Sequence, residues 1–195
     1  MSANDNALIV PGHGAVFQAR SSATLPADPL SAFVIGQDAP EGWTDLGHTS
    51  KENTIAFAKD GGENSQLDSW YMDAVRVVYG STTWTATINA LQMDKNTLDL
   101  AFNGELDAVA GRYVVPATAA ASTGQTVILF QDTSGSMLFH LPNTQTTLGE
   151  APSVSVEGFF EVQLSLSILS SSKLSANGRP GLMAIYGEWL KTTTP

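Results

Sequence analysis

The sequence predicts a mainly β protein, an antiparallel β-sandwich or barrel with one short flanking α-helix at about residues 94–103. Short runs of alternating apolar and polar residues recur from Trp43 onward. Clusters of Gly, Asn, Asp and Ser separate these runs, as turns separate antiparallel strands. Only one segment carries its apolar residues at helical spacing. We find no internal repeat, so the strands are expected to build one β domain.

The strands follow from their periodicity. In residues 83–91, Trp84, Ala86 and Ile88 fall on one face, and threonines fall on the other. The longest predicted strand is 154–168, with apolar residues at even positions and mostly polar residues at odd positions. Further strands are expected at 44–49, 54–59, 74–79, 126–131, 137–141 and 181–189. The strand 74–79 is predicted to be buried, because Arg76 is its only charged residue.

Turns and the helix are predicted from local chemistry. Asp60-Gly61-Gly62 and Asn177-Gly178 are expected to be turns. Asp94 stands at the N-cap position of the helix, and Gly104 stands where glycine commonly ends one.

The segment Asp132-Thr133-Ser134-Gly135-Ser136 matches a D-x-S-x-S magnesium-binding motif. A strand follows it rather than a helix, so we interpret it as a hairpin turn.

The chain is expected to have two parts. Residues 1–42 are predicted to be an irregular N-terminal arm, because prolines recur there and no period is sustained. Residues 43–195 are predicted to be a single β domain with an Ala- and Thr-rich loop at 111–124.

Charge and composition exclude several functions. Only 14 % of residues are charged and the net charge is −10, which argues against a basic nucleic-acid footprint. There is no cysteine, so disulfides and thiolate chemistry are excluded. Neither a signal peptide nor a membrane-spanning stretch is expected. A low charged fraction in a chain without a membrane segment suggests that neighbouring molecules cover part of its surface.

The sequence shows no catalytic constellation. His13, His48 and His140 are scattered without metal-ligand spacing. Glu157 and Glu161, if they share a strand face, are about 13 Å apart, too far for a glycosidase pair. We therefore expect no enzyme activity, no metal and no cofactor.

The tryptophans leave a sugar-binding alternative open. Trp43, Trp70, Trp84 and Trp189 are spread over different elements, whereas carbohydrate-binding modules gather aromatic side chains on one face. Trp84 is expected in the core, and Trp43 and Trp70 at loop edges where subunits could meet.

A run of motifs carries a family resemblance. The chain has Trp43-Thr44-Asp45-Leu46-Gly47, a tryptophan loop at 67–70, a Val75-Arg76 strand, the threonine-rich strand 83–91 and a helix ending at Gly104. After the hairpin at 127–141 comes an expected Leu141-Pro142-Asn143 turn. In order, these features resemble the major tail proteins of siphophages, particularly those that infect actinobacteria. The resemblance covers about 150 residues and departs from the family at 111–124.

The resemblance implies a structural virion protein of the phage tail, assembled in the host cytoplasm. Six subunits would form a ring, and stacked rings would form a tube with a negatively lined channel through which double-stranded DNA passes without sticking. Its expected partners are other copies of itself and the tape-measure, tail-terminator and tail-tip proteins. The alternatives are a carbohydrate- or receptor-binding β-sandwich and the tube subunit of a bacterial contractile injection system.

Two sets of residues are expected to serve assembly. The polar face of the long predicted strand is expected to line the channel: Glu157, Glu161, Gln163, Ser165 and Ser167. Unpatterned segments are expected to join successive rings, namely the arm before Trp43, the loop 60–69 and the loop 111–124. The residues expected at ring contacts are Trp43, Asp60, Gly61, Gly62, Glu63 and Trp70.

Overall fold

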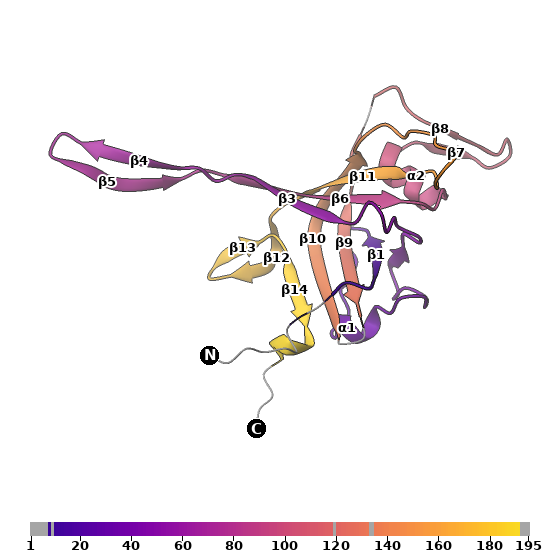
Figure 1. Ribbon diagram of the computed structural model, residues 1–195, viewed down its shortest axis with the longest axis horizontal. Coiled ribbons are helices and arrows are strands. Elements are labelled where there is room, and N and C mark those ends of the chain that lie inside the picture. The colour runs from indigo at the N-terminus through magenta and orange to yellow at the C-terminus, as the bar shows by residue number, and fades with distance from the viewer. Residues whose placement is uncertain (1–7, 9, 119, 133–134, 192–195) are drawn as a thin grey trace.

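The computed structural model describes residue 8 and residues 10–118, 120–132 and 135–191 (Figure 1). The protein is mainly β, with 49 % of residues in strands and 8 % in helices, and its sheets are antiparallel, as predicted.

The main sheet has eight strands in the order β2-β1-β9-β10-β11-β6-β3, with β14 also pairing with β10. Their bounds are β1 His13–Ala19, β2 Trp43–Asp45, β3 Ala56–Gly61, β6 Thr82–Ala90, β9 Ser122–Gln131, β10 Ser136–Leu148, β11 Val162–Ile168 and β14 Ala184–Gly187.

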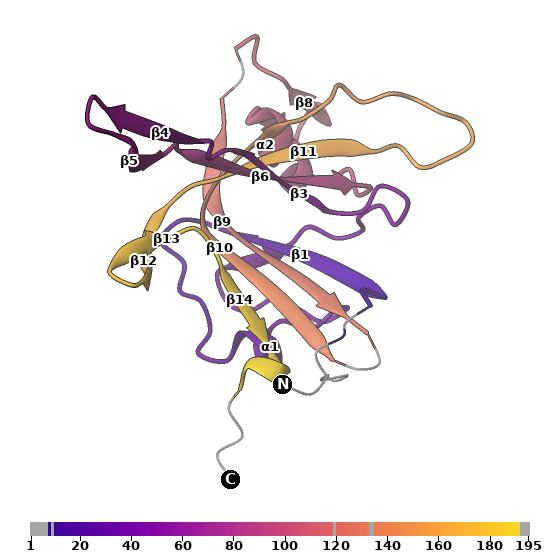
Figure 2. The ribbon, with the colours of Figure 1, turned by 60° about the vertical axis from the view of Figure 1, so that its left-hand side comes forward.

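One bend in β10 converts this sheet into two layers. The pairing of β10 with β9 shifts register between Leu141 and Thr144. Before this bulge β10 also pairs with β14, and beyond it β10 pairs with β11. The expected Leu141-Pro142-Asn143 turn is therefore wrong: these residues lie inside a strand. Pro142 has no N–H for the ladder, so a bulge accommodates it. In Figure 2 the layer containing β3, β6 and β11 crosses the layer containing β1, β9 and β10.

The first core fills the space between the two layers. It includes Val16 and Ile128 from one layer and Ile88, Leu164 and Leu166 from the other, all with no exposed surface. The even-numbered apolar residues of β6 and β11 face this core, as their alternation predicts.

A second core covers the other face of β1, β9 and β10. Phe17, Leu129 and Leu138 pack against Phe33 and Trp43, which belong to the segment 20–45 with its short helix α1 (Pro29–Ala32). The prediction of an irregular arm over residues 1–42 is thus wrong for β1, which is a central strand. Four successive residues of β1 are buried, because both faces of this layer are covered, so the strand shows no alternation.

Helix α2 (Lys95–Phe102) confirms the predicted helix. The Asp94 carboxylate accepts the Thr97 backbone N–H at 2.9 Å as the N-cap. The helix ends at Asn103, which adopts the left-handed conformation (φ 47°), one residue before the predicted glycine. A 3₁₀ turn, η2 (Glu188–Leu190), follows β14.

Three two-stranded hairpins extend from this body. They are β4 (Asn64–Ser69) with β5 (Met72–Tyr79), β7 (Glu105–Asp107) with β8 (Arg112–Val114), and β12 (Ser171–Ala176) with β13 (Arg179–Gly181). Asn177 and Gly178 form the turn between β12 and β13, both with positive φ, as predicted. The expected loop 111–124 contains β8 and the start of β9. The expected strand 181–189 is divided among β13, β14 and η2.

Candidate assembly surfaces

The layer that contains β3, β6 and β11 is called the outer layer below. One of its faces is polar and carries almost no charge. Register places Gln163, Ser165 and Ser167 of β11 beside Asn89, Thr87 and Thr85 of β6. The same face continues onto β10 and β3. We call it the polar sheet face, with the members Thr83, Thr85, Thr87, Asn89, Gln145, Thr147, Gln163, Ser165 and Ser167. It ends on β3 at Ala56, Ala58 and Asp60, of which only Asp60 is charged.

Two of the five predicted channel residues lie outside this face. The strand predicted over 154–168 begins only at Val162, so Glu157 lies in an exposed loop and Glu161 directly precedes β11. The Glu161 carboxylate accepts hydrogen bonds from the Ser50 hydroxyl (2.7 Å) and the Asn53 side-chain amide (2.8 Å). The alternation of residues 154–160 was misleading because no second layer covers them: Val154 and Val156 are 85 % and 101 % exposed.

The two edges of this layer differ. At one edge β3 pairs only with β6 among the described residues. At the other edge, the pairing of β9 with β1 stops at Gln125, so Ser122 and Thr123 pair with β10 on one side only within the described chain. The two unpaired edges offer backbone N–H and C=O groups to strands of other molecules.

The hairpin β4–β5, which we call the projecting hairpin, extends far from the body (Figure 1). Every one of its strand residues is exposed. The prediction of a buried strand at 74–79 is therefore wrong. Trp70 and Tyr71 at the tip are 108 % and 100 % exposed, and Val75 is 55 % exposed. So much apolar surface on one element is typical of an interaction surface.

Four of the predicted ring-contact residues form the base of this hairpin. Gly61 and Gly62 have φ of 76° and 79°, and a Cβ on Gly61 would lie 2.5 Å from the Ser81 carbonyl oxygen. Glycine is thus required where the β3–β6 ladder passes into the β4–β5 ladder. Asp60 Oδ1 accepts the Gly61 N–H at 2.8 Å, and Glu63 accepts the Gly80 N–H through its backbone carbonyl at 3.0 Å.

The projecting hairpin has internal order of its own. The Asp68 carboxylate accepts the backbone N–H of Ala74 at 2.7 Å, across the ladder and next to a register shift. Ala74 has φ 56°, a conformation that this bulge imposes. The Ser69 hydroxyl accepts the Met72 N–H at 3.1 Å and so closes the turn. The hairpin therefore holds a defined shape although no described part of its own subunit covers it.

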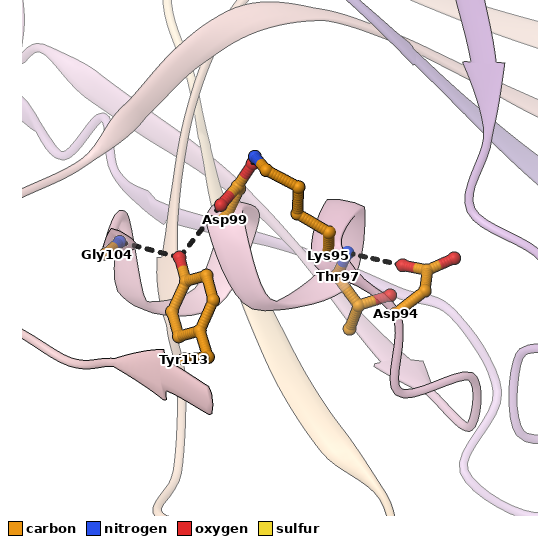
Figure 3. A network of polar contacts seen from close by, with 6 residues as sticks. All are labelled: Asp94, Lys95, Thr97, Asp99, Gly104 and Tyr113. Carbon is orange, nitrogen blue, oxygen red and sulfur yellow. Dashed lines mark hydrogen bonds and ion pairs between the residues drawn. The ribbon is translucent and has the colours of Figure 1, made fainter. Parts of the chain in front are cut away.

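A second projection, β7–β8, is fastened to α2 through Tyr113 (Figure 3). The Tyr113 hydroxyl donates to Asp99 at 2.9 Å and accepts the Gly104 N–H at 2.7 Å. Asp99 also pairs with Lys95 on the same helix. Burial, reinforced by the Asp99 carboxylate and opposed by the Gly104 N–H, raises the pKa of Tyr113, so the phenol remains a donor. Beyond this anchor, Val109 and Val114 are 101 % and 51 % exposed.

The tryptophans do not gather into one binding face. Trp43 is 6 % exposed, contacts Phe33 edge to face, and donates its indole N–H to the Thr24 carbonyl at 3.2 Å. The segment 20–45 buries this side chain within its own subunit, which does not favour the ring contact expected from sequence. Trp70 is the fully exposed tryptophan, at the hairpin tip.

The described residues contain no group of three or more acidic, histidine or cysteine side chains placed to hold a metal ion. Nor is any helix in this part of the chain long and apolar enough to cross a membrane. His140, on β10, is 4 % exposed and lies 3.2 Å from the Gln125 side-chain oxygen through Nε2. Burial, with a smaller effect from the Lys173 charge, lowers its pKa to about 4, so it is a neutral core residue.

The Asp132–Ser136 segment forms the connection between β9 and β10, as its turn chemistry predicts. The Asp132 carboxylate accepts the Gly135 N–H at 2.9 Å and the Val10 N–H at 3.0 Å. Thr133 and Ser134 lie outside the described residues.

Comparison with known proteins identifies the family. The family model for phage tail tube proteins matches residues 1–177. No match was found among curated proteins. The match includes β1 and the segment 20–45 as well as the outer layer, the projecting hairpin and α2. With this match across most of its length, the chain belongs to the phage tail tube protein family and is a structural component of the phage tail.

Proposed function

We propose that six copies of this protein close into a ring, that rings stack into the tail tube of a siphophage, and that the polar sheet face lines the channel. The observation that carries this proposal is a polar layer with two unlike unpaired edges, β3 on one side and the start of β9 on the other. Two different edges favour a head-to-tail contact, and head-to-tail contacts close into rings when the rotation between subunits permits. Pairing in this way also removes both exposed edges.

The chemistry of the polar sheet face suits a DNA conduit. Its nine members are Thr, Ser, Asn and Gln, so the face presents no Lys or Arg to a passing phosphate backbone. Cations on the wall would hold the DNA through counterion release. The structure favours a lining that is mainly neutral, with carboxylates at its borders from Asp60 and Glu161, rather than the wholly acidic strand face expected from sequence.

Exposed apolar surfaces supply the contacts between rings. The projecting hairpin exposes Trp70, Tyr71 and Val75, and the loop before β11 exposes Val154 and Phe159, the latter at 82 %. A free monomer would carry this surface at risk of aggregation, whereas a stacked ring covers it. The arm before Trp43 was expected from sequence to join rings, but it contains β1 (His13–Ala19). Deleting residues 1–30 would therefore test folding rather than assembly.

The ends of the tube would meet the tail-terminator and tail-tip proteins, and the growing channel would enclose the tape-measure protein. We place assembly in the host cytoplasm. The dispersed tryptophans do not support a sugar-binding module. The tube subunit of a contractile injection system would assemble through the same kinds of contact. The genes that neighbour this one would distinguish the two functions.

Electron microscopy of the purified protein at rising concentration tests the proposal. We expect hollow tubes or rings with six-fold rotational symmetry, and a cryo-EM map in which Thr87 and Ser165 face the channel. Tubes with these residues on the outer wall would remove the channel assignment. A protein that stays monomeric even when seeded with preassembled tail tips would contradict tube formation.

A further inference from the structure

The chain contains two Asn-Gly pairs, Asn103-Gly104 after α2 and Asn177-Gly178 between β12 and β13. In both pairs the asparagine is exposed and adopts the left-handed conformation, with φ of 47° and 53°. In this dipeptide the backbone nitrogen of the glycine readily attacks the preceding side chain, because glycine has no Cβ to hinder the approach. The two pairs differ in what surrounds that nitrogen.

The Gly104 nitrogen is engaged. Its N–H donates to the Tyr113 hydroxyl at 2.7 Å, and that hydroxyl donates to the Asp99 carboxylate at 2.9 Å (Figure 3). The space around Gly104 is also filled, since a Cβ there would lie 2.3 Å from the Val114 carbonyl oxygen. Burial raises the pKa of Tyr113, so the hydroxyl keeps its proton and both hydrogen bonds at mildly alkaline pH. The nitrogen therefore reaches the Asn103 side chain only if the contact between α2 and β8 breaks.

The Gly178 nitrogen is free. Its N–H has no acceptor among the described residues, and none of their atoms lies within 4 Å of the position that a Cβ would take. Beside this turn Ala176 pairs with Arg179. The next pair, Ser175 with Pro180, adjoins a register shift, and Pro180 has no N–H to donate to the ladder. All these residues are exposed, so the turn can open without disturbing either core.

We propose that Asn177 is a self-modification site, converted to aspartate and isoaspartate in the folded protein, and that Tyr113 protects Asn103 from the same reaction. The Gly178 nitrogen gives its proton to solvent base and bonds to Asn177 Cγ. The Cγ–Nδ2 bond breaks and ammonia leaves, taking up a proton, which forms a succinimide ring. Water then opens the ring. Cleavage between the nitrogen and Cγ gives aspartate, and cleavage between the nitrogen and the backbone carbonyl carbon gives isoaspartate.

The products change the hairpin β12–β13. Both place a carboxylate where a neutral amide stood, which makes the net charge of −10 one unit more negative. Isoaspartate also lengthens the main chain by one methylene, so the two-residue turn no longer fits the ladder. The hairpin is tied to the segment 20–23, because Lys173 donates to the Ser21 carbonyl oxygen. The modification therefore occurs close to a contact between β12 and the segment that covers the second core.

Peptide mapping by mass spectrometry tests the modification. In folded wild-type protein at mildly alkaline pH, we expect the amide-to-acid mass shift to accumulate at least several-fold faster at Asn177 than at Asn103. In the same buffer with urea the two positions should convert at similar rates, because the dipeptide is the same and the fold is lost. An enzyme that methylates isoaspartyl carboxylates should label the incubated wild type several-fold more than Asn177→Gln. A folded protein in which both positions react alike, or in which Asn177 stays intact, would overturn the proposal.

The variant Tyr113→Phe tests the protection. Its ring keeps the packing beside Gly104 but no longer accepts the N–H, so conversion at Asn103 should rise several-fold in the folded protein while Asn177 is unchanged. Asp107→Asn is the matched control, because the Asp107 carboxylate holds only β7–β8 together, through the Ala110 N–H and Arg112 at 3.1 Å each. An unchanged rate at Asn103 in Tyr113→Phe, or an equal rise in Asp107→Asn, would overturn the role of the hydroxyl. Both measurements use unassembled protein, so their outcome is independent of the proposed function.

Discussion

Strands β9 and β5 both carry a run of large apolar residues but lie in opposite surroundings. β9 carries Val127, Ile128 and Leu129, which are 0–1 % exposed between two cores. β5 carries Val75, Val77 and Val78, which are 39–55 % exposed. Each strand pairs with a neighbour through a ladder that one register shift interrupts, so hydrogen bonding does not distinguish them.

The difference lies in the layers around each strand. The β9 strand has the segment 20–45 on one face and the second sheet layer on the other, and both belong to its own subunit. The β5 strand has neither. The body is therefore complete as a monomer, whereas the projecting hairpin carries apolar surface whose covering layer must come from another molecule.

Removing the projecting hairpin should give the largest effect. Residues 64–79 would be replaced by Asn-Gly, which the ends allow because Gly80 N–H donates to the Glu63 carbonyl at 3.0 Å. We expect assembly into tubes to be lost while the monomer unfolds at nearly the wild-type temperature, since the hairpin contributes no residue to either core. Electron microscopy and thermal unfolding measure the two quantities. Tubes of normal length from this variant would show that the hairpin is dispensable.

Truncating one side chain in β9 should lower the free energy of unfolding much more than truncating one in β5. Leu129→Ala should lower the free energy of unfolding by about 2–5 kcal/mol, because it opens a cavity in a buried site. Val77→Ala, the matched change in the hairpin, should alter it by less than about 0.5 kcal/mol. Urea unfolding of the monomers measures both. Equal losses would mean that the hairpin packs against its own body in solution.

The body should also carry a pH dependence that the hairpin does not. The pKa of His140 is lowered to about 4, below its ordinary value of 6.5, so the unfolded state binds this proton more readily than the folded state. Its contribution to stability is then complete above pH 6.5 and is lost as the pH falls toward 4.

Between pH 7 and 4.5 this single group should remove about 2–3 kcal/mol of unfolding free energy. Comparing wild type with His140→Gln isolates the effect from the titration of carboxylates. An identical pH profile for the two proteins would show that His140 is protonated as easily in the folded state as in the unfolded state.

Local chemistry predicted the elements that depend on near neighbours in sequence. The Asp94 cap, the Asn177-Gly178 turn and the alternating strand β6 all follow from a few adjacent residues. The buried strand β1 was missed because Ala15, Val16 and Phe17 are covered on both faces and so show no period; the only available signal was a short apolar run between glycine and polar residues. The strand expected at 154–161 failed for the opposite reason, since alternation was present without a layer to bury it.

The assembly surfaces divide in the same way. The sequence indicated the polar residues Gln163, Ser165 and Ser167, the glycine joint at Gly61 and Gly62, and Trp70 at a loop. Only the structure shows that Thr85 and Thr87 belong to the same face, that Trp43 lies in the core, and that Glu157 lies outside the strand.

The sequence by itself determined a mainly β chain with one capped helix and no thiol chemistry. Its low fraction of charged residues also indicated that neighbouring molecules cover part of its surface. The tertiary structure decided which apolar runs lie inside the subunit and which lie outside. Periodicity reports whether the two faces of a strand differ in their surroundings, but it does not report which chain supplies the covering layer. That choice depends on contacts between residues far apart in sequence, such as Phe17 with Phe33 and Ile88 with Leu164, and on surfaces that only neighbouring copies can complete.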